Sequence, residues 1–213
     1  MKILKLSTLV ACSALAAAAA AEVPAPQHAE HHPGTPGGPS SEFVKTIRKA
    51  TARFRDVKQA EAEGYMLHFG CVSDEDAGAM GLHYVNMGLV GDGVLDPERP
   101  EIVIYEPLPN GRLKLIGADF LVIAEAWHAA NPATPELGGQ LFHLFEAPNR
   151  FGLPPFYTLH VWAWKKNQNG MFVNWHPKVT CDNFSAAAGG IEQGLRETAG
   201  SLDAYSKYVR AWS

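Results

Sequence analysis

Four histidines lie inside short apolar runs of this 213-residue sequence. Each has apolar neighbours on both sides, in a run that favours a β-strand; they are His68, His83, His143 and His160. One such histidine can simply face water from an alternating strand, but four in one chain indicate a shared site. Because neutral imidazole is the commonest metal ligand among side chains, we predict that these histidines bind a metal, with His83 and His160 as the leading pair.

Two carboxylates occupy similar apolar surroundings. Glu106 follows the run Ile-Val-Ile-Tyr, and Asp119 interrupts a second apolar run. A carboxylate buried in such a place must be hydrogen-bonded, paired or bound to metal. Two or three imidazoles with one carboxylate suit Zn, Fe, Mn or Cu with an open coordination position. The sequence thus predicts a mononuclear metal site. The alternatives are histidines satisfied by hydrogen bonds, and a histidine–carboxylate pair that performs acid–base chemistry without metal.

About half of the aromatic residues lie between positions 141 and 184. A packed core explains part of this density, and a pocket for a small apolar or aromatic molecule is the functional interpretation. Alternation along 157–164 places His160, Trp162 and Trp164 on one face. The predicted pocket residues are Tyr84, Tyr105, Phe142, Trp162 and Trp164. In an enzyme, the metal would polarise a small substrate or activate water or oxygen; in a binding or carrier protein, the same groups would orient an apolar ligand without metal.

The common catalytic motifs do not decide between an enzyme and a binding protein. The chain contains no GxSxG, HExxH, CxxC, Walker or GxGxxG pattern. Its net charge of −4, without a basic stripe, argues against nucleic acid as a partner. We expect a small-molecule ligand or substrate and no membrane span. The oligomeric state is left open, as is a structural or envelope-associated role.

The N-terminus has the plan of a secretory signal peptide. Lys2 and Lys5 precede an apolar run that ends in small residues at 19–21, so residues 1–21 are predicted to be removed on export to the periplasm or the medium. Residues 9–12 also match a bacterial lipobox, which makes a lipoprotein anchored through Cys12 the alternative.

Two cysteines remain once the signal peptide is removed. Because Cys71 and Cys181 would then enter an oxidising compartment, we expect a disulfide between them. Two buried thiols, or one thiol that binds metal, are the alternatives.

The remaining chain is predicted to be an α+β protein. Residues 22–41, rich in Pro and Gly with several His, read as a flexible tail, and 42–213 as a single globular domain. We expect one helix from 42 to Gly64, a closing helix from about 201, and an antiparallel β-barrel or strongly curved sheet between them. Its expected strands are 65–72, 81–87, 101–107, 112–122, 140–145, 157–164 and 170–175, with Asn110-Gly111 as a hairpin turn.

Three stretches resemble an uncharacterised family of secreted bacterial proteins. They are GAMGLHYVN at 78–86, LHVWAWK at 159–165 and NWHPKVTC at 174–181. The resemblance covers most of residues 42–181, and it implies secretion and a single domain but no activity. In that family Asn usually stands at the position of His176, so the resemblance assigns His176 no ligand role.

Overall fold

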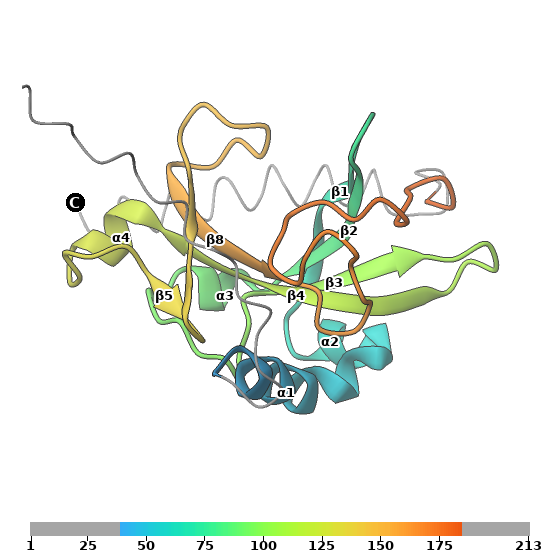
Figure 1. Cartoon of the computed structure of the whole chain (residues 1–213), viewed down its shortest axis with the longest axis horizontal. Helices are drawn as coiled ribbons and strands as arrows, with labels where there is room; N and C mark the ends of the chain where they lie inside the picture. The colour runs from blue at the N-terminus through green and yellow to red at the C-terminus, as the bar shows by residue number, and fades with distance from the viewer. Residues whose placement is uncertain (1–38, 185–213) are drawn as a thin grey trace, which may run out of the picture. The chain divides into compact units, whose positions relative to one another are not determined.

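A six-stranded antiparallel sheet organises this computed structural model, which describes residues 39–184 (Figure 1). The strand order is β1-β2-β3-β4-β8-β7, and a small second sheet pairs β5 with β6. The strands are β1 (Met66–Asp74), β2 (Gly78–Val85), β3 (Ile102–Pro107), β4 (Leu113–Ile123), β5 (Glu136–Leu137), β6 (Gln140–Leu141), β7 (His143–Phe145) and β8 (Phe156–Val161).

Bulges and a glycine give the sheet its curl. The pairing of β1 with β2 shifts register between His68 and Cys71, and that of β3 with β4 shifts between Ile104 and Tyr105. Such bulges bend a strand and increase its twist. Gly81 has a φ of +102°, and a Cβ there would lie 2.6 Å from the Tyr105 carbonyl oxygen. The strongly curved sheet expected from the sequence is therefore confirmed, as a half-barrel.

The N-terminal helical region consists of three pieces, α1 (Pro39–Thr51), η1 (Ala52–Arg55) and α2 (Val57–Ala62). The prediction of one continuous helix from 42 to 64 is therefore wrong, because the region is divided into three helical pieces. Asp56 adopts an extended conformation and caps α2 by accepting a hydrogen bond from the Lys58 N–H, which ends one helix and starts another. Two shorter helices follow, α3 (Met87–Val90) and α4 (Ala124–His128).

The two faces of the sheet bury different clusters of side chains. Phe43, Val44 and Ile47 of α1 pack on one face, against side chains such as Phe120 and Leu159. On the opposite face lies a second cluster, which includes Ile102, Ile104, Leu121, Phe156 and Trp162. Side chains alternate between these faces along each strand, so polar residues within the second set must be buried as well.

The hairpin expected at Asn110-Gly111 joins β3 to β4, with Gly111 at a φ of +73°. The prediction of a strand at 170–175 is wrong. This segment is irregular, and it follows a turn that contains Asn167 and Gly170. That segment folds back so that the Val173 carbonyl accepts a hydrogen bond from the Trp162 indole. The predicted signal peptide, most of the predicted tail and the predicted closing helix lie outside the described residues.

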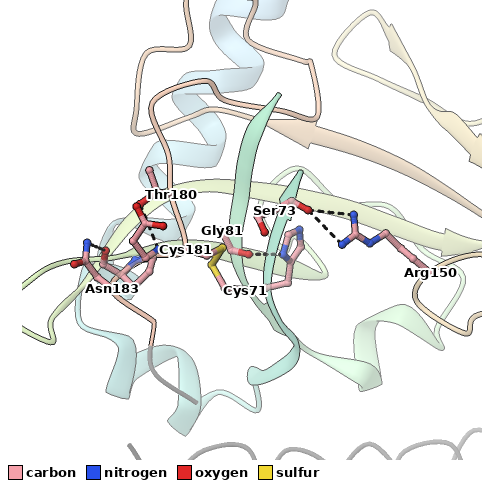
Figure 2. Close-up of a disulfide and its surroundings, with 10 residues drawn as sticks. Cys71, Ser73, Gly81, Arg150, Thr180, Cys181 and Asn183 are labelled. Carbon is pink, nitrogen blue, oxygen red and sulfur yellow. Dashed lines mark hydrogen bonds between the residues drawn. A yellow bond between two sulfur atoms is a disulfide. The ribbon is translucent and has the colours of Figure 1, made fainter. Parts of the chain in front are cut away.

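The disulfide expected between Cys71 and Cys181 is present, with an S–S distance of 2.04 Å (Figure 2). It links the bulge of β1 to the segment that follows β8. None of the helices within residues 39–184 combines the length and apolar character needed to cross a bilayer.

Replacing both cysteines by alanine should lower the free energy of unfolding by about 4 kcal/mol, because the bond closes a loop of 110 residues in the unfolded chain. Urea denaturation of the oxidised protein and the double variant measures this difference. Reductant should destabilise the natural protein and leave the variant unchanged. Equal stability of the two oxidised proteins would contradict the expectation.

Candidate metal centre

Side chains of three strands converge on the inner face of the curled sheet: His83 from β2, Asp119 from β4 and His160 from β8. One potential ligand atom from each lies within 4.8 Å of the others. All three are buried, with exposed fractions of 4%, 7% and 1%. Asp119 and His160 are direct partners in the β4–β8 pairing. Strand β3 separates His83 from Asp119, and the two are offset along it, with His83 opposite Ile104 and Asp119 opposite Ile102. The curl therefore brings His83 to the other two.

His160 is the least satisfied polar side chain of the group. Neither ring nitrogen has a hydrogen-bond partner, although both are buried. Nδ1 lies 4.0 Å from Asp119 Oδ2, which is too long for a hydrogen bond. Burial lowers the pKa of His160, so the ring is neutral and this contact is not an ion pair. An unpartnered buried polar group costs about 1–3 kcal/mol, so the site needs a partner for this ring.

His83 has one nitrogen fixed and the other available. Its Nδ1 lies 3.2 Å from the Gly81 carbonyl oxygen. Since a carbonyl only accepts, Nδ1 carries the proton and Nε2 keeps its lone pair. Burial lowers the pKa of His83 to about 4, which keeps the ring neutral near pH 7. Histidines that bind metal usually donate their second nitrogen in this way.

Asp119 is oriented by its neighbour in the sheet. The Thr158 hydroxyl donates to Asp119 Oδ1 at 2.5 Å, and Oδ2 is the oxygen closer to His160. Burial raises the pKa of this carboxyl to about 7. A cation beside it would favour the ionised form, because an opposite charge stabilises a carboxylate.

A cavity of about 30 Å³ reaches two of the three residues. Its polar lining consists of His83, Asp119, Thr158 and Asn174. Its apolar lining consists of Phe69, Met80, Ile102, Leu121, Phe145, Phe151, Leu153 and Phe156. This volume accommodates one or two water-sized molecules, so only a very small molecule fits beside the histidine and the carboxylate.

The other predicted ligands are not part of the three-residue group. His68 is buried and pairs with His83 across β1 and β2, which puts it near the site. His143 is exposed on the edge strand β7. The Glu106 carboxylate forms an ion pair with Lys165 at 2.5 Å.

None of the five aromatic residues predicted to line a pocket lines this cavity. Tyr84 and Tyr105 pack around Phe54 on the helix side, and Phe142 belongs to the α1 cluster. Trp162 does lie near the site, with its ring centroid 4.5 Å from that of His160.

Trp164 belongs to the helix side because β8 ends at Val161, so the strand alternation does not continue to it. Its indole N–H donates to the Thr51 hydroxyl of α1.

Two buried polar residues near the site were not predicted from the sequence. Thr158 could have been found, because it lies two residues before His160 in the same expected strand and therefore shares its face. Glu101 had no comparable signal, because a glutamate at the first position of the expected strand 101–107 is typical of an exposed strand end. Its side chain is buried and accepts a hydrogen bond from the Leu121 N–H at 3.0 Å. Burial raises the pKa of Glu101 to about 8, and the charges of Asp92 and Asp119 add to the effect.

No protein-family model, curated protein or solved structure matches this chain. The site is therefore interpreted from the chemistry of its own residues.

Substituting Glu101→Gln should remove part of the pH dependence of stability. The folded-state pKa of about 8 lies above the ordinary glutamate value of 4.5, so the stabilising protonated form is lost as pH rises through this window. The free energy of unfolding of the variant should equal that of the natural protein near pH 4. Near pH 8 it should be larger by a few kcal/mol, since one pKa unit corresponds to about 1.4 kcal/mol.

Urea denaturation across this pH range, with chelator present, measures the difference. Asp119 titrates in both proteins, and because its charge helps to raise the pKa of Glu101, the difference reports Glu101 together with its coupling to Asp119. Parallel stability curves would show that Glu101 is ionised in the folded protein.

Proposed function

We propose that the protein binds one divalent transition-metal ion through His83, Asp119 and His160, and that the cavity admits a small molecule to that ion. The observation that carries the proposal is the buried His160 ring, whose nitrogens have no hydrogen-bond partner while two further metal-ligating side chains lie beside it. A metal ion would coordinate one nitrogen of this ring and neutralise the carboxylate at the same time.

The donor set fits a transition metal. Two neutral imidazoles and one carboxylate are the ligands of several mononuclear Zn and non-heme Fe sites, and they leave coordination positions open. Mn and Cu also accept this set. Ligand atoms lie about 2 Å from such ions, so two ligands of one ion are at most about 4 Å apart. The three side chains here would have to draw together by roughly 1 Å from their 4.8 Å spread.

The surroundings also support binding. The Gly81 carbonyl orients His83, and the Thr158 hydroxyl orients Asp119. Outer partners of this kind fix ligand geometry and raise metal affinity.

An enzyme that acts on a small apolar molecule is the function that these features favour. A bound ion would supply Lewis acidity, or would activate water or oxygen. The apolar lining excludes bulk water, which strengthens electrostatic interactions inside the cavity. Asn174 contributes an amide that can orient a bound molecule.

A metal-free carrier for an apolar ligand is the weaker candidate. Aromatic rings do line the cavity, but its volume of about 30 Å³ is far below the roughly 300–1,000 Å³ of typical small-molecule pockets. A carrier would also have no need of a buried carboxylate beside two histidines.

We further propose that the protein works outside the cytoplasm. The Cys71–Cys181 disulfide supports this location, because such bonds persist in oxidising compartments. The predicted signal peptide agrees with it.

Metal analysis of the purified protein, prepared without a His-tag or chelator and then offered Zn, Fe, Mn or Cu, tests the metal site. We expect about one ion per chain in the natural protein and its loss in His160→Leu. The variant should stay folded, because an apolar side chain of similar size replaces an unpartnered buried ring.

His143→Ala is the matched control, since this exposed histidine lies on the edge strand and should not affect the bound ion. Both variants keep the histidines before position 39. Any metal bound by those histidines would therefore be the same in both variants and would not account for a difference between them. A folded natural protein that takes up no metal, or His160→Leu with unchanged metal content, would overturn the proposal.

A further inference from the structure

Phe69 has an unusual backbone conformation at the edge of the cavity. Its φ is +66°, and within residues 39–184 it is the sole residue other than glycine with a positive φ. A bulky side chain in this region is strained, and the conformation persists only where the surrounding structure enforces it. Gly70 follows with the same φ, inside the bulge between His68 and Cys71.

Covalent and polar contacts hold β1 directly after this bulge (Figure 2). Cys71, two residues after Phe69, is bonded to Cys181. Further along β1, the Ser73 carbonyl accepts hydrogen bonds from the Arg150 guanidinium at 3.3 and 3.4 Å. Arg150 belongs to the loop between β7 and β8, so β1 and that loop are held together beside the cavity.

The same loop supplies the ring that meets Phe69. The ring centroids of Phe69 and Phe151 are 5.3 Å apart in an edge-to-face contact, and both rings line the cavity. Both are half-buried, whereas His83 and Asp119 deeper in the cavity are buried. Phe69 and Phe151 therefore form part of the wall between the candidate ligands and solvent.

We propose that Phe69 determines which molecules reach the metal: it restricts the open coordination position to ligands of two or three heavy atoms, such as dioxygen or azide, and excludes rings. This rests on the proposed metal site. The cavity volume of about 30 Å³ sets the limit, and the Phe69 ring stands in the cavity wall in edge-to-face contact with Phe151.

Visible absorption of the Co(II)-loaded protein, titrated with azide and with imidazole, tests the restriction. In the natural protein azide should change the spectrum and imidazole should not. Phe69→Gly removes the ring and adopts a positive φ without strain. In this variant imidazole should bind at least about tenfold more tightly than in the natural protein, with azide affinity changed far less.

Phe142→Ala is the matched control, because it removes a buried ring from the opposite face of the sheet and should keep the natural selectivity. Phe151→Ala removes the other ring of the contact without altering the bulge, and it should also admit imidazole even if Phe69→Gly folds poorly.

The two proposals fail in different ways. A folded natural protein that takes up no Co(II) overturns the metal site and this inference with it. A Co(II)-loaded natural protein that binds imidazole as tightly as Phe69→Gly and Phe151→Ala overturns the role of Phe69 and leaves the metal site standing.

Discussion

Burial of polar side chains is the constraint on which this structure depends. A sheet that encloses two imidazoles and a carboxylate must provide each with a hydrogen-bond or metal partner, because these buried groups have lost their hydrogen bonds to bulk water. The Gly81 carbonyl serves His83 and the Thr158 hydroxyl serves Asp119, while His160 is left with two unpartnered nitrogens. A single cation placed among the three would coordinate one of those nitrogens and pair with the Asp119 carboxylate, and this is the physical basis of the proposed metal centre.

The curl of the sheet makes that arrangement possible. His83 and Asp119 are separated by a whole strand, and in a flat sheet they would stand too far apart to share an ion. Bulges bend the strands, and Gly81 lets one strand approach the Tyr105 carbonyl closely. Helix α1 covers the opposite face with apolar side chains, whereas the inner face buries the polar group within a second apolar cluster.

The sequence predicted the parts that depend on local pattern. Alternation and apolar neighbours gave six candidate ligands, of which His83, Asp119 and His160 come together in the fold, and the cysteine count predicted the disulfide. Strand register and bulges could not be predicted, because they depend on pairing between distant segments. Trp164 was misplaced for this reason, since β8 ends before it, and Phe69 gave no signal because its role follows from the bulge.

X-ray absorption at the metal K-edge of the reconstituted protein tests the central claim most directly, because it reports the atoms bound to the ion. We expect two imidazole nitrogens together with oxygen donors, and loss of one imidazole contribution in His83→Gln if that variant retains metal. A spectrum with only oxygen donors, or one unchanged by His83→Gln, would contradict the assignment of the ion to His83, Asp119 and His160.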